Sequence, residues 1–323
     1  MSDSAAAGIE ITADLVRDLL REQHPDLAEL PVREVAGGWD NQQWRLGDEL
    51  AVRLPRTERA PELQRKECRW LPHLAPRLPI PVPRPVRVGK PSARFPKRWT
   101  VMTWVPGEPL DRTSISRADH AADTLADFLR ALHVAAPAEA PGVVDRGAHP
   151  GAYTEGFDRL IRSVALGVKA DEVRADEVRA DGVRADGVRA DEVRAVWDDA
   201  VAAPAWEGPP VWVHGDLHPA NVVVSGGTLS GVIDFGDLFA GDPAWDLAAA
   251  WVVLPEGAAT RFFDAYAHAD GATIRRARGL AALKSLFLML MGHNGERGLP
   301  GGKPSWGPAG RAALGRALSD GGR

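Results

Sequence analysis

Three side chains that can bind metals or protons lie close together in the segment of residues 211–248. Asp216 and Asn221 occur in HGDLHPAN, and Asp234 follows in IDFGD. Phosphoryl transfer needs a base at the acceptor hydroxyl and oxygen ligands for a magnesium ion that bridges nucleotide phosphates. Hard cations prefer carboxylate and amide oxygens. The spacing therefore predicts Asp216 as the base and Asn221 and Asp234 as ligands of Mg²⁺.

The residues around these three predict the elements that position them. Short apolar runs bounded by turn residues indicate strands, and Ser225-Gly226-Gly227 indicates a tight turn. The expected elements are a strand, a loop and the two strands of a hairpin, over residues 211–213, 214–221, 222–224 and 229–233. The hairpin is expected to return Asp234 to the side of Asn221.

Two other interpretations use the same residues. On an extended strand, His214, Asp216 and His218 would face one side and could bind zinc or a metal pair for hydrolysis, with Asp234 as a fourth ligand. Gly215 and Pro219 favour a loop instead, in which both histidines are packing residues and His214 supports the loop from beneath. An inactive nucleotide-binding module is the third interpretation, and the presence of a base and two metal ligands argues against it. Asp246 is expected to cap backbone amides and hold the loop.

The same segment resembles the aminoglycoside phosphotransferase family, whose members are related to protein kinases. HGDLHPAN matches the kinase catalytic-loop pattern H-x-D-x-x-x-x-N, IDFGD matches the metal-binding D-F-G, and GDPAWDLA follows. AGGWDNQQWRLGDELAVRLPR is similar to the family's nucleotide-covering hairpin, and WTVMTWVPGEPL to its interlobe hinge. Two parts of the chain lie outside the resemblance: the repeated five-residue units of residues 170–194 and the C-terminal fifty residues.

The resemblance implies ATP or GTP as the phosphate donor, together with Mg²⁺. It places Thr103 and Val105 at the adenine through their backbone groups, and Gly37 and Gly38 where the hairpin approaches phosphate. Glycine is suited to such a close approach because it has no side chain. Trp104, beside the hinge, is a candidate for stacking on the base.

One position departs from the kinase pattern. Where kinases have a lysine on the third strand, this sequence has Arg53, which keeps the charge but presents a rigid fork to the phosphates. Glu67 in the following helix is the preferred ion-pair partner, and Glu62 is the competitor.

The pattern along the chain predicts an α+β, two-lobed, protein-kinase-like fold. An antiparallel-sheet lobe for the nucleotide is expected over residues 1–102, a hinge over 103–108, and a larger, mainly helical lobe over 109–323. Apolar residues at helical spacing predict helices, and alternating runs with Gly or Pro breaks predict strands. Helices are expected at 12–23, 62–74, 116–134 and 274–291, and strands within 32–54, near 86 and at 100–105.

Residues 170–194 are five tandem pentads, ADEVR, ADEVR, ADGVR, ADGVR and ADEVR. A five-residue step on a helix carries the valines around the axis, so no apolar stripe forms. We expect a solvated, lengthened helix or a flexible insert that can be removed without loss of folding.

Composition limits the class of protein and its partners. The chain has 323 residues, a net charge of -5, 45% hydrophobic residues and one cysteine, Cys68. These values are typical of a globular enzyme in a reducing compartment such as the cytoplasm. No apolar run reaches the roughly 20 residues of a membrane span. The weak acidity argues against nucleic acid as a partner, and the oligomeric state is left open.

The acceptor is the least determined part of the function. The resemblance implies a hydroxyl of an aminoglycoside, hence antibiotic resistance, while a macrolide or a small metabolite such as a sugar or an amino alcohol is the alternative. One catalytic loop serves many alcohols, so the choice falls to the helical lobe. The candidate acids for the acceptor pocket are Asp237, Asp242, Glu256, Asp264 and Glu296.

Overall fold

The chain divides into two compact units. The computed structural model describes residues 9–35, 38–142, 146–166, 184–185, 188–299 and 301–320. Met1–Pro76 and Val82–Val105 form one unit, here called the N-terminal unit, and Arg77–Pro81 and Pro106–Arg323 form the C-terminal unit. The boundary at residue 105 falls inside the segment 103–108 that the sequence assigns to the hinge.

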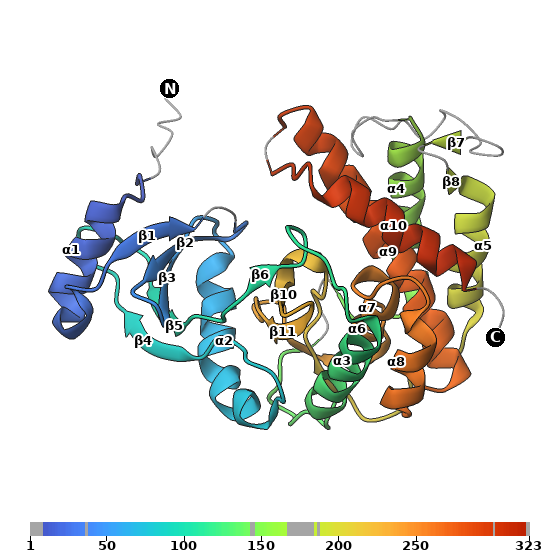
Figure 1. Ribbon diagram of the computed structural model, residues 1–323, viewed down its shortest axis with the longest axis horizontal. Coiled ribbons are helices and arrows are strands. Elements are labelled where there is room, and N and C mark those ends of the chain that lie inside the picture. The colour runs from blue at the N-terminus through green and yellow to red at the C-terminus, as the bar shows by residue number, and fades with distance from the viewer. Residues whose placement is uncertain are drawn as a thin grey trace. The chain divides into compact units, whose positions relative to one another are not determined.

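The N-terminal unit is built on a five-stranded antiparallel sheet in the order β1-β2-β3-β5-β4 (Figure 1). Its strands are β1 Val32–Val35, β2 Asn41–Leu46, β3 Leu50–Pro55, β4 Pro85–Gly89 and β5 Trp99–Thr103. Its helices are α1 Ala13–Gln23 and α2 Ala60–Leu74. The first three strands form the expected meander, and α2 begins two residues before the expected start.

Burial of apolar residues fixes α1 against this sheet. Thr12 Oγ1 accepts the Leu15 N–H at 3.2 Å and so begins the helix. The apolar residues of α1 recur on one face, as the sequence predicts, and they are buried with residues of the sheet. This core includes Val16, Leu19, Leu20, Trp44, Leu46, Val52, Leu54 and Trp99.

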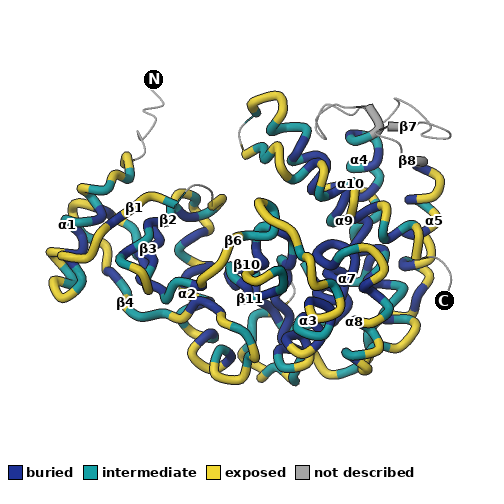
Figure 2. The backbone as a smooth tube through the Cα atoms, in the orientation of Figure 1, coloured by how far each residue is buried: buried dark blue, intermediate teal, exposed yellow. Residues whose placement is uncertain are grey.

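The C-terminal unit is mainly helical. Its helices are α3 Ala118–Leu132, α4 Thr154–Leu166, α5 Ala190–Ala202, α6 Ala244–Leu247, α7 Ala249–Val252, α8 Ala258–Tyr266, α9 Gly271–Glu296 and α10 Trp306–Ser319. Much of α9 is dark blue in Figure 2, because it is buried within the unit. At both ends, α9 extends beyond the helix expected at 274–291. Asp270 caps α9 by accepting the Thr273 N–H at 2.7 Å.

Short strands of the C-terminal unit flank the residues predicted to do chemistry. They are β6 Glu108–Pro109, β9 Val211–Val213, β10 Val222–Ser225, β11 Thr228–Val232 and β12 Phe239–Gly241. The β10–β11 hairpin is antiparallel, as expected, and β6 pairs with the other edge of β10. A separate antiparallel pair, β9 with β12, fixes the start of the predicted catalytic loop.

The last pentad is not a solvated insert, and the prediction for this part of the repeat is wrong. Residues 190–194 form the first turn of α5, and Val193 is only 1% exposed. Val193 packs in a core with residues of α4 and α9. The failure has a physical reason: α5 continues past the repeat with Val196 and Trp197, which complete an apolar face that no pentad has alone. Within the first four pentads the structure describes only two short paired strands, β7 Arg184–Ala185 and β8 Val188–Arg189.

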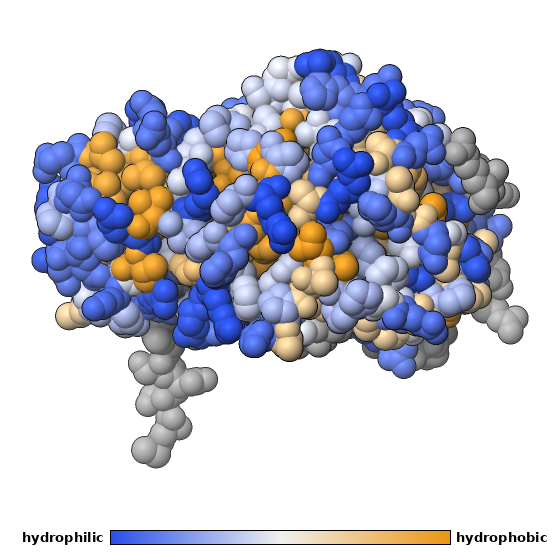
Figure 3. Space-filling view, turned by 90° about the horizontal axis from the view of Figure 1, so that it is seen from below, coloured by the Kyte–Doolittle hydropathy of each residue, from blue (hydrophilic) through white to orange (hydrophobic). Residues whose placement is uncertain are grey.

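The expected fold class is confirmed, with an antiparallel-sheet unit followed by a larger helical unit. Within the described residues, none of the helices combines the length and apolar character required to cross a bilayer. The face drawn in Figure 3 is mostly hydrophilic. The large apolar side chains that are exposed among the described residues are Ile9, Leu30, Trp39 and Phe287.

Candidate active site

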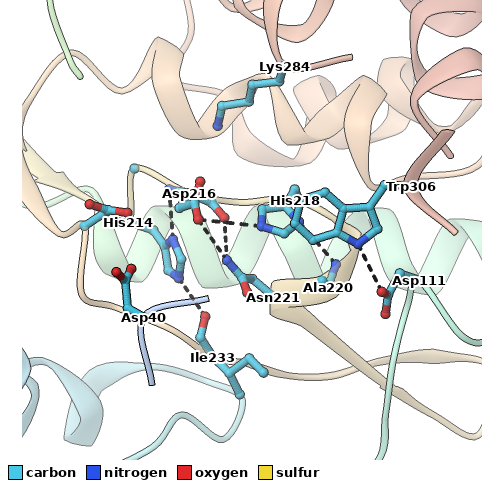
Figure 4. A network of polar contacts seen from close by, with 12 residues as sticks. Asp40, Asp111, His214, Asp216, His218, Ala220, Asn221, Ile233, Lys284 and Trp306 are labelled. Carbon is cyan, nitrogen blue, oxygen red and sulfur yellow. Dashed lines mark hydrogen bonds and ion pairs between the residues drawn. The ribbon is translucent and has the colours of Figure 1, made fainter. Parts of the chain in front are cut away.

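Asp216 lies on the loop that follows β9, and neighbouring groups hold its carboxylate (Figure 4). Asn221 Nδ2 donates to the main-chain oxygen of Asp216 at 2.9 Å and to its Oδ2 at 3.2 Å. The Asp216 side chain is 30% exposed. The five-residue spacing thus closes the loop on itself and leaves the carboxylate accessible.

Asn221 and Asp234 are brought together by the hairpin, as the sequence predicts. The Ile233 N–H donates to the Asn221 carbonyl oxygen at 2.9 Å, so Asp234 follows directly beside Asn221. Because Asn221 Nδ2 is committed to Asp216, its amide oxygen is the atom that can bind a cation. An amide oxygen and a carboxylate suit Mg²⁺, which keeps one or two protein ligands and takes the rest from phosphates and water.

The backbone at Asp234 adopts an uncommon conformation. Its φ is 65°, in the left-handed region that side chains other than glycine rarely enter. Aspartate tolerates this region better than most residues, but the conformation still costs about 1 kcal/mol or more. Such strain is typical of functional sites, and here it falls on the predicted metal ligand.

His214 supports the loop from beneath, as expected. It is fully buried, with its ring against Phe235 at a centroid distance of 4.5 Å. Its Nδ1 accepts the Asp216 N–H at 3.2 Å, so Nε2 carries the proton and donates to the Ile233 oxygen at 3.0 Å. Burial lowers the pKa of His214, which keeps the imidazole in this neutral form.

Asp246, at the start of the helices after β12, holds the beginning of the loop. Its Oδ2 accepts the His214 N–H at 2.6 Å, and its Oδ1 accepts the Gly215 N–H at 3.0 Å. His133 Nε2 lies 3.3 Å from Oδ2. Burial alone raises the pKa of Asp246, but the hydrogen bond from His133 and nearby positive charge outweigh it and hold the pKa below its ordinary value. The carboxylate therefore serves the loop rather than the chemistry.

His218 borders the site on the other side of Asp216. Its Nδ1 accepts the Ala220 N–H at 3.3 Å, and its Nε2 lies 3.6 Å from Asp216 Oδ2. The ring packs edge-on against Trp306 at the start of α10, with centroids 4.8 Å apart (Figure 4). Asp111 Oδ2 accepts the Trp306 Nε1–H at 3.2 Å and fixes that indole.

This geometry excludes the zinc-site interpretation. His214 is buried with both ring nitrogens engaged, so it cannot share a metal with Asp216 and His218. In the part of the chain that the structure describes, no group of three or more His, Cys, Asp or Glu side chains could hold a metal ion.

Two basic side chains that the sequence motifs do not include lie near the Asp216 carboxylate. Arg146 Nη1 donates to Asp216 Oδ1 at 2.6 Å. Lys284 extends from α9 toward Asp216 and donates to the Trp245 oxygen at 2.9 Å (Figure 4). Burial alone raises the pKa of Asp216, but His218, Arg146 and Lys284 outweigh it, and the pKa lies well below its ordinary value. Asp216 is therefore ionised at neutral pH.

In the N-terminal unit, the expected ion pair between Arg53 and Glu67 is present. Arg53 Nη1 lies 2.8 Å from Glu67 Oε1 and 2.6 Å from Oε2, and both residues are buried. Glu62, the competitor, pairs with Arg65 on the exposed side of α2. The pair joins β3 to α2 and fixes the guanidinium of Arg53.

Gln64 strengthens the same junction between α2 and the sheet. Its Nε2 donates to Asn41 Oδ1 at 2.7 Å and to the Arg53 oxygen at 3.2 Å. Gly38 precedes β2 and has a φ of 79°, and a Cβ on this residue would lie 2.3 Å from the main-chain oxygen of Asn41. Only glycine therefore fits this turn; its partner in the prediction, Gly37, lies outside the described residues.

The residues predicted to lie at the adenine differ in which of their groups are already engaged within the N-terminal unit. The Thr103 N–H donates to the Arg84 oxygen at 2.9 Å, so this donor is used within the N-terminal unit. Val105 is buried at the end of the unit. The Trp104 N–H donates to the Glu49 oxygen at 2.7 Å, and Arg45 covers its ring at 4.5 Å from the centroid, so one face of the indole is occupied.

The five candidate acids for an acceptor pocket have different surroundings. Asp237 lies near the base, because Arg146 Nη1 is 3.2 Å from its Oδ2. Asp242 is buried against Arg276 Nε at 2.7 Å, and its Oδ1 accepts the Ala244 N–H, so its role in packing replaces the expected pocket role. The other three are exposed on the C-terminal unit: Glu256, Asp264 and Glu296.

Sequence reasoning missed Arg146, Lys284 and Gln64. Arg146 belongs to no motif and lies in an irregular segment, so nothing in the sequence marks it. Lys284 had a signal, because a single lysine interrupts the apolar run from Leu280 to Leu290 and must find a polar partner.

Comparison with known proteins agrees with this geometry. The sequence model of the phosphotransferase enzyme family matches residues 31–280. No curated protein matches the chain. The GDP complex of wild-type aminoglycoside 2'-phosphotransferase-IIIa is similar in structure, with a TM-score of 0.65 and 19% identity over 94% of this chain and 98% of that one.

Two further solved structures are similar over nearly the whole chain. The gentamicin complex of APH(2")-IIa has a TM-score of 0.59 and 17% identity, covering 95% of this chain and 96% of that one. Macrolide 2'-phosphotransferase MphH from Brachybacterium faecium has a TM-score of 0.58 and 21% identity, covering 92% and 97%. This coverage brings the C-terminal segment, which the motifs do not reach, within the shared fold.

The matched residues and the fold define the class of protein as a kinase-like phosphotransferase. The chain belongs to the phosphotransferase enzyme family, since the match spans residues 31–280 and includes the catalytic loop. The predictions of this family, of its protein-kinase-like fold and of an enzyme that phosphorylates a small molecule are confirmed.

Proposed function

We propose that the protein transfers the γ-phosphate of ATP or GTP to a hydroxyl of an aminoglycoside or a similar amino sugar, with Asp216 at the acceptor. The observation that carries this proposal is the loop 214–221, in which Asn221 holds the ionised Asp216 carboxylate in an accessible position. A carboxylate there can accept a hydrogen bond from an incoming hydroxyl.

The chemistry of a carboxylate defines the form of the role of Asp216. An ionised carboxylate is too weakly basic to remove a proton from a free alcohol. It orients the hydroxyl, and takes the proton when the bond to phosphorus is forming, which suits the loose transition state of phosphoryl transfer. Arg146, His218 and Lys284 keep Asp216 ionised for this purpose.

Asn221 and Asp234 would hold Mg²⁺ through the Asn221 amide oxygen and the Asp234 carboxylate. When bound, the ion neutralises charge on the nucleotide phosphates. The Asn221 side chain links this function to the base, because its Nδ2 contacts Asp216. A change at Asn221 is therefore expected to affect both.

The N-terminal unit would bind the nucleotide. Arg53 would contact the phosphates, with its guanidinium fixed by Glu67, and Gly38, together with Gly37, would let the hairpin approach them. Val105, and Thr103 through its carbonyl oxygen, would offer backbone groups to the base. Structures similar to this chain have been solved with GDP and with ADP, which supports either GTP or ATP as the phosphate donor.

The acceptor class draws support from the groups around the catalytic loop. Trp306 lies against His218 with its Nε1 held by Asp111, and a fixed indole suits the face of a sugar ring bearing ammonium groups. The net charge of -5 favours a cationic acceptor. Similar structures have been solved with kanamycin and with gentamicin, and others are macrolide phosphotransferases.

Mass spectrometry of the products tests the proposal. Wild-type protein is incubated with Mg²⁺, ATP or GTP, and separate members of three acceptor classes: aminoglycosides, macrolides, and sugars or amino alcohols. We expect an aminoglycoside to gain one phosphoryl group. A phosphorylated macrolide or metabolite, with no aminoglycoside product, would replace the acceptor class and retain the chemistry. Asp216→Asn is the control for contaminating kinases.

A further inference from the structure

Arg146 forms an ion pair with the predicted base, although it lies far from the motif in sequence. A single guanidinium nitrogen, Nη1, lies 2.6 Å from Asp216 Oδ1 and 3.2 Å from Asp237 Oδ2. The same nitrogen is 3.5 Å from the Gly215 main-chain oxygen. Arg146 therefore joins the catalytic loop to the turn between β11 and β12.

The segment that carries Arg146 is anchored independently of the catalytic loop. Gly147 has φ 99°, a conformation that lets the chain turn directly after Arg146. The Ala148 N–H donates to Tyr153 Oη at 3.0 Å, and the Ala148 oxygen accepts the Trp245 Nε1–H at 3.3 Å. The rings of Tyr153 and Trp245 also pack edge-to-face, 5.3 Å apart. The guanidinium is thus delivered from a fixed support.

The contacts of Arg146 fix the plane of the Asp216 carboxylate. Asp216 Oδ1 is bonded to Arg146, while Oδ2 is bonded to Asn221 Nδ2. With a different partner on each oxygen, rotation about the side chain breaks at least one bond. Each carboxylate oxygen can accept more than one hydrogen bond, so a position for the acceptor hydroxyl remains.

Asp237 makes Arg146 more than a counter-ion for the base. The carboxylates of Asp216 and Asp237 both contact one nitrogen of Arg146, so they lie close enough to repel each other. The positive charge of Arg146 between them reduces this repulsion and the repulsion of the phosphates. Arg146 and Asp216 are 33% and 30% exposed, and half-exposed ion pairs contribute little to folding stability. Removal of Arg146 should therefore alter the geometry of the site more than the fold.

We propose that Arg146 is a positioning residue that, anchored by Asp237, holds the Asp216 carboxylate in the orientation that receives the acceptor hydroxyl. This inference rests on the proposed function, because it assigns Asp216 to the acceptor. It predicts an effect on turnover that disappears when Asp216 can no longer act, and it predicts little effect on the binding of nucleotide.

A double-mutant cycle on the full-length protein tests this role, with Arg146→Ala, Asp216→Asn and the double variant. Arg146→Ala alone should lower kcat on the order of 10- to 100-fold, the usual effect of a misplaced catalytic group. The KM for nucleotide should change by less than about twofold, because no ground-state contact to it is lost. In the Asp216→Asn background, the same substitution should change kcat by less than about twofold.

Conservative variants and a matched control separate positioning from folding. Arg146→Lys should recover part of kcat, since one ammonium nitrogen can still lie between two carboxylates, and Arg146→Gln should recover less. Arg261→Ala removes another arginine–aspartate pair, with Asp123, between α8 and α3, and should leave kcat unchanged. Thermal midpoints of all variants identify any that fail to fold.

Each other outcome overturns the inference. An equal loss of kcat from Arg146→Ala in both backgrounds would mean that Arg146 acts independently of Asp216. A change only in the KM for the acceptor would mean that Arg146 contacts the acceptor directly. A rise in kcat would mean that Arg146 hinders the reaction in the wild-type protein. A wild-type protein that phosphorylates no acceptor would overturn the proposed function and this inference together, whereas an active wild type with an additive cycle would overturn this inference alone.

Discussion

The carboxylate of Asp246 accepts the backbone N–H of His214 at 2.6 Å, which joins the start of α6 to the start of the catalytic loop. The neighbouring Gly215 N–H is bound by the other oxygen of the same carboxylate at 3.0 Å. Two consecutive amides after the end of β9 are satisfied by one buried side chain. The position of Asp216, one residue further on, depends on this contact.

Asp246→Ala should therefore destabilise the C-terminal unit. The substitution leaves two buried N–H groups and His133 without their acceptor, and each unsatisfied group costs about 1–3 kcal/mol. We expect a loss on the order of 3 kcal/mol or more in the free energy of unfolding, measured by urea denaturation. Asp123→Ala, which removes an exposed partner of Arg261, is the control and should move the midpoint little.

The same carboxylate predicts how stability depends on pH. Because the pKa of Asp246 is lower in the folded protein than in the unfolded chain, where it is about 3.9, the unfolded chain binds the proton first as the pH falls. Its contribution is complete above about pH 5 and is lost progressively below about pH 4. Urea midpoints of wild type and Asp246→Asn, measured from about pH 7 to about pH 3, should converge in acid. Parallel curves would contradict this assignment.

The pair of Arg53 and Glu67 predicts a specific effect on the nucleotide. Arg53→Lys keeps the charge but replaces the planar guanidinium whose Nη1 contacts both Glu67 oxygens, so the phosphates should be bound less well. We expect the KM for nucleotide to rise about tenfold and the KM for acceptor to change by less than about twofold. Arg65→Ala, which removes the exposed pair with Glu62 on the same helix, is the matched control. A larger change in the acceptor KM would remove Arg53 from the nucleotide site.

Substitutions at Val193 test whether the last pentad belongs to the core of the C-terminal unit. Its side chain is 1% exposed beside Trp197, so Val193→Asp buries an unpaired charge and should cost about 3 kcal/mol or more, while Val193→Ala should cost roughly 2 kcal/mol. Asp198→Ala, on the exposed side of the same helix, should be close to neutral. Deletion of 170–194 removes the first turn of α5 with Val193 and should destabilise the C-terminal unit. A folded, stable deletion would restore the insert interpretation.

The strands and helices of the N-terminal unit were predictable because each is determined locally. Apolar spacing marks α1, and turn residues mark the meander of β1 to β3. The hairpin that returns Asp234 to Asn221 was predictable for the same reason, since its turn, Ser225-Gly226-Gly227, is encoded in adjacent residues. Where local signals agree with the global fold, sequence reasoning is reliable.

The parts that could not be predicted depend on long-range contacts. Arg146 reaches Asp216 across 70 positions of the chain, and no spacing rule applies at that distance. The role of Asp242 was mistaken because its partner, Arg276, comes from α9 and makes this candidate pocket acid half of a buried ion pair. The first turn of α5 has an apolar role only because α4 and α9 pack against it.

In the proposed reaction, Asp216 receives the acceptor hydroxyl when the γ-phosphate is transferred. Its most direct test measures, on wild type and Asp216→Asn side by side, the rate of phosphorylated acceptor formation by mass spectrometry and the affinity for the Mg²⁺ nucleotide by titration calorimetry. We predict that Asp216→Asn lowers the rate by a factor on the order of 10² to 10⁴ and leaves the nucleotide affinity nearly unchanged. A variant that retains near-normal turnover would show that Asp216 does not receive the acceptor hydroxyl.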